Sequence, residues 1–220
     1  LFLPFFLVVE QPDLATGLML AAISGTMLFL MKIRTWILAS LIGAIVFAVP
    51  IAWNYVLRDY QKARITNFMD PGNDPKGTGY NSLQSRIAVG SGKVVGKGFR
   101  KGTQSQLEFL PERHTDFIFS VLSEEHGFLG SMGTIGLFMV LFFVGIRIAS
   151  TARDKFGALL SIGVLCYLFW HMFINVGMVI GLLPIVGVPL PLLSYGGSSM
   201  LTTMAGLGLI SSVAYRRYLF

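Results

Sequence analysis

The sequence has little charge and almost no cysteine. Of its 220 residues, 13% are charged and 54% are hydrophobic, whereas a soluble domain carries about 25% charged residues. The single cysteine, Cys166, lies within an apolar run, which excludes an intrachain disulfide framework and a thiolate metal site. The composition therefore excludes an ordinary soluble domain and a disulfide-stabilised secreted one.

Charged residues are absent from several segments that are long enough to cross a bilayer. We predict spans at 14–31, 36–57, 129–149, 157–180 and 197–214, preceded by a partial span at 1–9. A buried core helix would explain one such segment but not five. The predicted fold is an all-α polytopic membrane protein, in which residues 1–220 form a single membrane domain. Because the chain begins at Leu1 inside an apolar run, we expect it to be a fragment that lacks earlier spans.

Basic residues predict the orientation of these spans. The segments 32–35, 147–156 and 215–220 must face the same side, and they carry seven Lys or Arg against one acid, Asp154. The positive-inside rule places them in the cytoplasm. The long segment 58–113 then lies outside, although it holds the remaining ten basic residues. The net charge of +6 is therefore assigned to topology and lipid contact, and we predict no nucleic-acid partner.

Segment 58–113 is predicted to be a large external loop. Residues 67–81 are rich in Gly, Pro, Asn and Asp and predict turns, while 82–106 mix Gly with Lys, Arg and Gln. The loop leads into LEFLPERHTDFIFSVL, which begins at Leu107 and is the densest cluster of titratable groups in the chain. The next predicted span follows shortly after this cluster, so its polar groups are expected at the mouth of the membrane domain.

Asp116 in this cluster has two interpretations from the residues alone. Thr115 or Asp116 could cap the helix that starts FIFSVL, as short oxygen-bearing side chains commonly do. Alternatively, a desolvated carboxylate at the membrane surface could act as a base, with a neighbouring cation such as Arg113 holding a phosphate. The second arrangement would suit the transfer of a sugar from a lipid diphosphate, but spacing alone does not name the reaction.

Three sequence blocks resemble one known family. Residues 90–130, GSGKVVGKGFRKGTQSQLEFLPERHTDFIFSVLSEEHGFLG, and residues 175–200, NVGMVIGLLPIVGVPLPLLSYGGSSM, closely resemble the SEDS glycosyltransferases of shape, elongation, division and sporulation. Gln11-Pro12-Asp13-Leu14 matches the family element QPDLGT, with Ala15 replacing its Gly. The blocks GTQSQL and LPIVGVPLP look like the elongation branch, the RodA type. A sporulation-type or division-type (FtsW) relative remains an alternative.

This resemblance implies a peptidoglycan glycosyltransferase that polymerises lipid II into glycan strands at the outer face of the bacterial cytoplasmic membrane. It implies ten spans in the complete protein, of which this chain supplies roughly the last six. The implied partners are lipid II, the growing glycan strand, a class B penicillin-binding protein that crosslinks the strands, and the elongation machinery. A divalent cation, Mg²⁺ or Mn²⁺, is a further expectation, although no ligand spacing in the sequence establishes a metal site.

The resemblance also assigns residues. Asp116, in the HTDFIF element, is expected to be the catalytic base or to orient the acceptor hydroxyl. The expected substrate-binding residues are Gln11, Asp13, Lys97, Gln104, Glu108, Glu112, Arg113 and His114. Lys97, Arg100, Lys101 and Arg113 are candidates for holding the diphosphate, and by composition a solvated basic loop explains them equally well. Glu124, Glu125, His171 and the Ser194–Gly197 turn are assigned structural roles.

Two functions of other classes compete with polymerisation. A carrier that moves the lipid-linked precursor across the bilayer would need polar groups at mid-membrane depth. The middles of the predicted spans hold no Asp, Glu, Lys or Arg, which favours chemistry at the external mouth. A scaffold that only recruits another enzyme would have no need of Asp116.

Overall fold

The computed structural model describes residues 14–30, 59–70, 77–106 and 114–216, together with six isolated positions between 36 and 54. The regular elements in these ranges are all helices: α2 (Leu14–Leu30), α4 (Asp59–Met69), α5 (Thr78–Ser91), α6 (Thr103–Gln106), α7 (Ile118–Ser150), α8 (Lys155–Val179) and α9 (Gly197–Arg216). The predicted all-α class is confirmed. The predicted spans at 1–9 and 36–57 lie outside the described residues or are described only at isolated positions.

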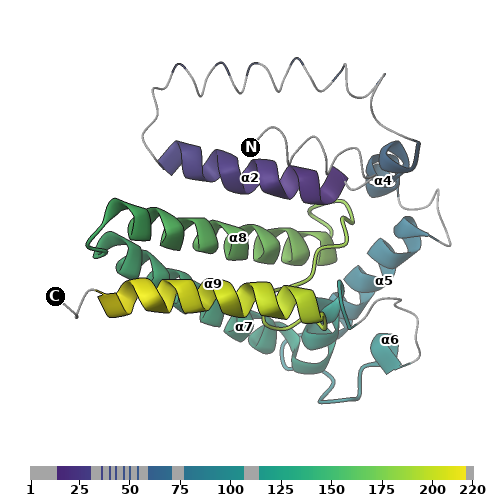
Figure 1. Ribbon diagram of the computed structural model, residues 1–220. Coiled ribbons are helices and arrows are strands. Elements are labelled where there is room, and N and C mark those ends of the chain that lie inside the picture. The colour runs from purple at the N-terminus through teal and green to yellow at the C-terminus, as the bar shows by residue number, and fades with distance from the viewer. Residues whose placement is uncertain are drawn as a thin grey trace.

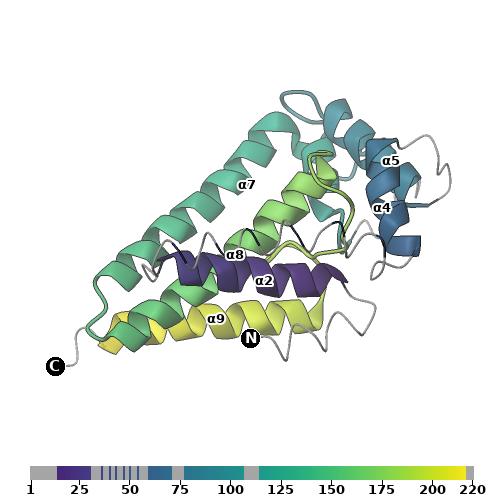
Figure 2. The same cartoon turned by 90° about the horizontal axis from the view of Figure 1, so that it is seen from above.

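Four apolar helices lie side by side, and the short helices gather at one end of them (Figure 1). Helix α8 is central and contacts α2, α7 and α9. The view from above also places α4 and α5 at the end of the bundle that is far from the C-terminus (Figure 2). Arg147, Arg153 and Lys155 lie at the opposite end. The predicted orientation therefore makes the end carrying α4, α5 and α6 external, and we call it the external end on that basis.

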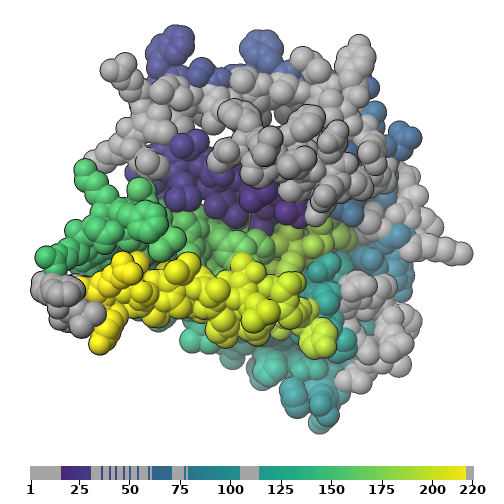
Figure 3. Space-filling view, viewed as in Figure 1, coloured from purple at the N-terminus to yellow at the C-terminus, as the bar shows by residue number. Residues whose placement is uncertain are grey.

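Helices α7, α8 and α9 are long and apolar enough to cross a membrane, and α2 is a shorter apolar helix. These helices match the predicted spans at 129–149, 157–180, 197–214 and 14–31. Many of their large apolar side chains point outward, as expected for surfaces that face lipid. Helix α9 occupies much of one face of the molecule (Figure 3).

The buried core lies where α7, α8 and the segment after α8 meet. Phe117, Phe138, Leu168, Met178 and Leu190 belong to it. Close helix packing is helped by a small residue at one crossing, since a Cβ on Gly145 would collide with the side chain of Leu165. Small residues that let backbones approach are typical of membrane helices, which have little hydrophobic driving force between them.

The segment predicted as an external loop contains helices, which corrects the sequence interpretation. Helix α4 extends to Met69 and α5 begins at Thr78, so both enter the 67–81 stretch that was predicted to be turns. The physical reason is tertiary packing, because α5 contacts α7, α8 and α4. Ser85 of α5 is buried and donates to the Val179 carbonyl at the end of α8, with an Oγ–O distance of 3.1 Å.

Helix α7 has two parts that meet at Gly127. This residue has φ +66° and ψ −161°, which is not helical. Across it, the hydroxyls of Ser123 and Ser131 are only 2.8 Å apart. Residues eight apart in a straight helix are separated by about 12 Å along the axis, so the chain must turn sharply here. The first part, 118–126, links the Asp116 region to the external end of the spanning part, 128–150.

Candidate active site

The turn formed by residues 114–117 carries Asp116 and immediately precedes α7. Phe117 is the N-cap residue of α7, and it makes no side-chain capping bond. The N-cap position is therefore Phe117, one or two residues later than the Asp116 or Thr115 that the sequence suggested. The reason is that the buried Phe117 and Phe119 rings anchor the helix start in the core and fix where the helix begins. Asp116 itself is half-buried, so its carboxylate lies at the boundary of the core.

Three consecutive backbone carbonyls of this turn each accept a hydrogen bond. The Tyr195 amide donates to the His114 carbonyl (2.9 Å), the Ser194 hydroxyl donates to the Thr115 carbonyl (2.6 Å), and the Asn175 amide donates to the Asp116 carbonyl (2.8 Å). Each donor comes from α8 or from the segment between α8 and α9. Sequence positions some 60 to 80 residues apart therefore fix the backbone that carries Asp116.

Asn175 and Ser194 each hold two backbone segments together. Nδ2 of the fully buried Asn175 also donates to the Val188 carbonyl at 2.6 Å. Oγ of Ser194 also accepts from the Leu190 amide at 2.6 Å. Within this turn, Leu192 has φ +68°, a left-handed conformation that is costly for a residue with a Cβ. The buried hydrogen bonds of Asn175 and Ser194 hold the turn in this strained conformation.

The carboxylate of Asp116 lies over Gly187. A Cβ on Gly187 would lie 3.3 Å from Asp116 Oδ2, and the φ of this glycine is +77°. The preceding residue, Val186, has its carbonyl 3.5 Å from Nη1 of Arg64 on α4. The Asp116 carboxylate therefore lies against Gly187, and the Arg64 guanidinium lies against the preceding residue, Val186. In such an arrangement the carboxylate could accept a proton, and the guanidinium could stabilise negative charge.

A cavity of about 620 Å³ opens beside this turn. It is lined by His114, Ile118, Met200 and the segment 193–197. His114 is exposed, as is the aromatic ring of Tyr195. The cavity is thus next to Asp116 along the chain and offers imidazole and aromatic groups at its rim.

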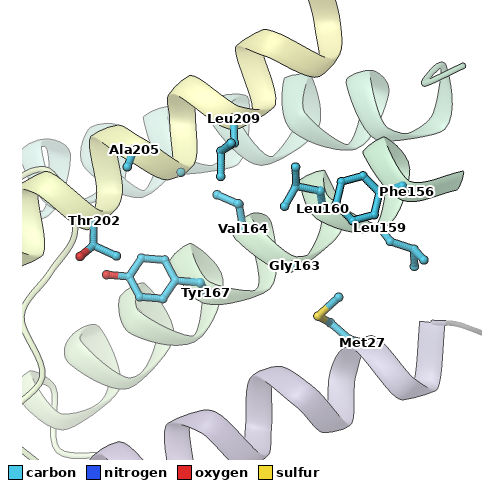
Figure 4. A pocket seen from close by; sticks show the side chains of 11 residues that line it. Met27, Phe156, Leu159, Leu160, Gly163, Val164, Tyr167, Thr202, Ala205 and Leu209 are labelled. Atoms are coloured by element: carbon cyan, nitrogen blue, oxygen red, sulfur yellow. The ribbon is translucent and has the colours of Figure 1, made fainter. Parts of the chain in front are cut away.

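A second cavity, of about 670 Å³, lies between α2, α8 and α9 (Figure 4). Met27 from α2, Val164 and Tyr167 from α8, and Leu209 from α9 point toward it. Its eleven lining residues include no carboxylate, imidazole or amine. Tyr167 is the one titratable residue in this lining, so the cavity offers neither a carboxylate base nor a cation for a phosphate, and the chemistry is better sited at the Asp116 turn.

The predicted substrate residues Lys97 and Gln104 surround another carboxylate, that of Glu124. Glu124 is fully buried, and its Oε1 accepts from Lys97 Nζ at 2.7 Å, from Thr103 Oγ1 at 3.1 Å and from the Gln104 backbone amide at 3.0 Å. Lys97 Nζ also contacts Thr103 Oγ1 at 2.7 Å. These contacts fit the structural role assigned to Glu124. They give Lys97 an ion-pair partner, while its role toward substrate stays a prediction.

Five of the predicted site residues lie outside the described residues: Gln11, Asp13, Glu108, Glu112 and Arg113. Among the residues that the structure does describe, no group of three His, Cys, Asp or Glu side chains could hold a metal ion. The divalent cation therefore stays a prediction without a site in this part of the chain, and no chemical step is derived through it.

Sequence reasoning missed three residues near Asp116. Asn175 was noted only as the start of a motif, Gly187 was not singled out, and Arg64 was not considered at all. A buried Asn near the external end of an apolar span was a usable signal, because buried polar groups normally have partners. Arg64 gave no such signal, since it is one of many basic residues in a long polar segment.

Comparison with known proteins places the chain in a family. The family model of cell cycle proteins that covers FtsW, RodA and SpoVE matches residues 1–219. The chain is 47% identical over 218 residues to the peptidoglycan glycosyltransferase MrdB of Escherichia coli K12, covering 99% of this chain and 59% of MrdB. The chain thus spans about three fifths of the length of that relative.

Two solved structures have similar folds. One belongs to a study of how a peptidoglycan synthase complex coordinates polymerization and crosslinking; its matching chain has a TM-score of 0.79 and 29% identity, covering 97% of this chain and 59% of that one. The other is the rod shape determining protein RodA of Thermus thermophilus, with a TM-score of 0.63 and 27% identity, covering 98% of this chain and 54% of that one.

Proposed function

The chain belongs to the FtsW/RodA/SpoVE family, and from that membership we propose that the protein is a peptidoglycan glycosyltransferase that polymerises lipid II. The observation that carries the proposal is the placement of Asp116. Its carboxylate is half-buried at the external end of the apolar helices, on a turn whose three carbonyls are held by Tyr195, Ser194 and Asn175. Fixed geometry of this kind is what a general base requires.

In the proposed reaction, a hydroxyl of lipid II attacks the anomeric carbon of the growing strand. The new C–O bond forms as the bond from that carbon to the lipid diphosphate breaks, and the diphosphate leaves with the electron pair. Asp116 takes the proton of the attacking hydroxyl or orients that hydroxyl. A half-buried position suits this role, because partial desolvation makes a carboxylate a stronger base.

The departing diphosphate needs positive charge near it. Arg64 is a candidate that the geometry adds, since its guanidinium approaches Val186 while Asp116 approaches Gly187. Arg binds phosphate groups in a bidentate manner, and such contacts accelerate the reaction if they strengthen as charge develops on the leaving group. Arg113 and Lys97 remain further candidates from the sequence, and Glu108, Glu112, Gln104, His114, Gln11 and Asp13 remain proposed contacts to the sugars or the metal.

The branch, the location and the partners complete the proposal. The GTQSQL block and the similarity to a rod shape determining protein favour the elongation branch over the division branch. The active site would face the outside of the cytoplasmic membrane. A class B penicillin-binding protein is the proposed crosslinking partner, which is supported by similarity to a chain in a complex that couples polymerization to crosslinking.

A lipid carrier is the competing function, and charge placement argues against it. Between Phe128 and Ile146 of α7, and along α8 and α9 between their terminal residues, there is no Asp, Glu, Lys or Arg. A carrier for a diphosphate headgroup would need polar contacts at that depth. The charged side chains are found at the helix ends and in the external segment.

The test uses the purified complete protein with fluorescent lipid II. We expect the parent to form glycan polymer and Asp116→Asn to form none, while the two proteins have the same thermal midpoint. Asp59→Asn is the matched control, because Asp59 is an exposed acid on the external helix α4. An active Asp116→Asn protein would contradict the base assignment. Lipid II translocation without polymer formation would instead identify a carrier.

A further inference from the structure

The external segment 93–101 presents large apolar side chains to its surroundings. Val94, Val95 and Phe99 are 59%, 74% and 70% exposed. Such residues are unusual in close succession on a surface that faces only water, and contiguous apolar patches generally mark contact with a partner or a membrane. None of these three side chains has a place in the candidate active site, so their exposure calls for a separate explanation.

Backbone hydrogen bonds fix this segment beside the break in α7. The Phe128 amide donates to the Lys93 carbonyl at 2.8 Å, and the Leu129 amide donates to the Val94 carbonyl at 3.1 Å. On the other side of Gly127, the carbonyls of Glu124 and Glu125 accept from the amides of Lys97 and Gly98. The backbone of the segment thus bonds to the amides and carbonyls at the two helix ends that meet at Gly127. These groups lack partners within the helix because of the break.

The two bonds to Phe128 and Leu129 also fix the depth of the segment. The spanning part of α7 runs from Phe128 to Ser150, which is about 34 Å at 1.5 Å per residue, and the bilayer hydrocarbon is about 30 Å thick. With Arg147 near the opposite surface, Phe128 falls at the external boundary of the hydrocarbon. Phe128 and Leu129 are themselves 60% and 61% exposed. Val94 and Val95 therefore adjoin a lipid-facing helix surface at the depth of the headgroups.

Charge on the segment is entirely positive. Lys93, Arg100 and Lys101 are exposed, and the Arg100 guanidinium lies 5.5 Å from the centre of the Phe99 ring. No Asp or Glu occurs anywhere in residues 77–107. Apolar side chains flanked by Lys and Arg fit the surface of an anionic bilayer, where the rings and aliphatic groups enter the acyl boundary and the cations stay at the phosphates.

We propose that residues 93–101 form an anchor in the outer surface of the membrane. Val94, Val95 and Phe99 insert at the acyl boundary, and Lys93, Arg100 and Lys101 bind anionic lipid headgroups. The occupant is the bulk lipid of the bilayer, which gives Arg100 and Lys101 a role other than the diphosphate contact that the sequence suggested for them. The depth of the segment can be measured whether or not the proposed enzymatic activity is correct. The anchor would hold the first part of α7, which starts two residues after Asp116, at a constant depth in the membrane.

The same segment could instead be a docking surface for a protein, and two observations favour lipid. The Val94 carbonyl is bonded to the amide of Leu129, an exposed residue of α7, and the depth of this contact coincides with the expected membrane boundary. A protein partner would not need the patch to lie at that level. Bulk lipid would cover the segment when the protein is alone in a bilayer, whereas a protein partner would cover it only when that partner is added. An experiment can therefore distinguish the two.

The test is the depth of a spin label on the complete protein in lipid nanodiscs. A cysteine replaces Val95 in a background in which Cys166 is Ala and any other cysteine is removed. Reference labels replace Leu137, an exposed residue near the middle of the spanning part of α7, and Thr151, in the charged connection between α7 and α8. Collision with oxygen reports lipid, and collision with a water-soluble nickel chelate reports water.

We expect the Val95 label to collide with nickel several-fold less than the Thr151 label, and to lie at a depth between the two references. Adding phosphatidylglycerol to phosphatidylcholine discs should deepen the Val95 label. This shift should vanish in the triple variant Lys93→Gln, Arg100→Gln, Lys101→Gln, while the label remains inserted. Nickel access equal to that of Thr151, or protection that arises only when a partner protein is added, would overturn the anchor. A shift that persists in the triple variant would overturn the headgroup contacts.

Discussion

The buried amide of Asn175 on α8 donates a hydrogen bond to the backbone carbonyl of Asp116 over 2.8 Å. The same nitrogen reaches the Val188 carbonyl, so one side chain positions the candidate base relative to the segment on which its carboxylate rests. The relationship connects the Asp116 turn to a helix that is long and apolar enough to span a membrane, and we expect Asn175 to act as a positioning residue.

Replacing Asn175 should therefore reduce both activity and stability. Asn175→Ala leaves two buried carbonyls without their donor, which costs about 1–3 kcal/mol for an unsatisfied group. Asn175→Asp should be worse, because a carboxylate offers no donor and repels the two carbonyl oxygens. The measurements are polymerisation of lipid II and thermal unfolding in detergent. A fully active Asn175→Asp protein would show that the amide does not position Asp116.

Substitution at Gly187 should affect the site more than the fold. Gly187→Ala places a Cβ 3.3 Å from Asp116 Oδ2 and forces an alanine to adopt φ +77°, which costs about 1–2 kcal/mol. Polymerisation should fall at least severalfold as the carboxylate is displaced. Gly136→Ala is the matched control, since a Cβ there meets nothing within 4 Å. Equal activities of the two variants would argue against close contact between Asp116 and this segment.

Breaking the ion pair between Lys97 and Glu124 should destabilise the external segment. Removing one partner of a buried pair leaves an uncompensated charge and costs about 3–5 kcal/mol, whereas replacing both can be nearly neutral. Lys97→Met should thus lower the thermal midpoint, and the double variant Lys97→Met, Glu124→Leu should recover much of the loss.

The same double variant separates the two roles of Lys97. If Lys97 only balances Glu124, lipid II binding should recover along with the thermal midpoint. If Lys97 also holds the diphosphate, binding should stay weak in the stable double variant. Measuring lipid II affinity and unfolding on the same preparations distinguishes these outcomes.

Membrane topology is a separate prediction. In a background with Cys166→Ala, a cysteine at exposed Lys101 should react with an impermeant maleimide added to intact cells. A cysteine at Lys155 should react only after the membrane is opened. The expectation follows from the basic residues at the ends of α7, α8 and α9. The reverse pattern would move the Asp116 turn to the cytoplasm and exclude polymerisation outside.

The sequence by itself determined the class of the protein and much of its organisation. Charge-free runs predicted α2, α7, α8 and α9, because a backbone in lipid must satisfy its own hydrogen bonds and the helix does so locally. The HTDFIF element, through its resemblance to the family, made Asp116 the candidate base, and the basic connections predicted an orientation. These signals are local in the chain, so no knowledge of distant contacts was needed to find them.

Only the tertiary structure decided how the site is built. Polar composition concealed α4 and α5, which are helical because they pack against each other and because α5 packs against α7 and α8. Nothing in the spacing of Asn175, Ser194 and Gly187 indicated that all three meet the Asp116 turn, because hydrogen bonds between residues 59 or 79 positions apart have no signature in one sequence. The turn at Gly127 likewise depends on the bonds that residues 93–98 make across it. Local backbone preference is enough to form the helices. The position of the Asp116 carboxylate depends instead on contacts with segments that are distant in the sequence.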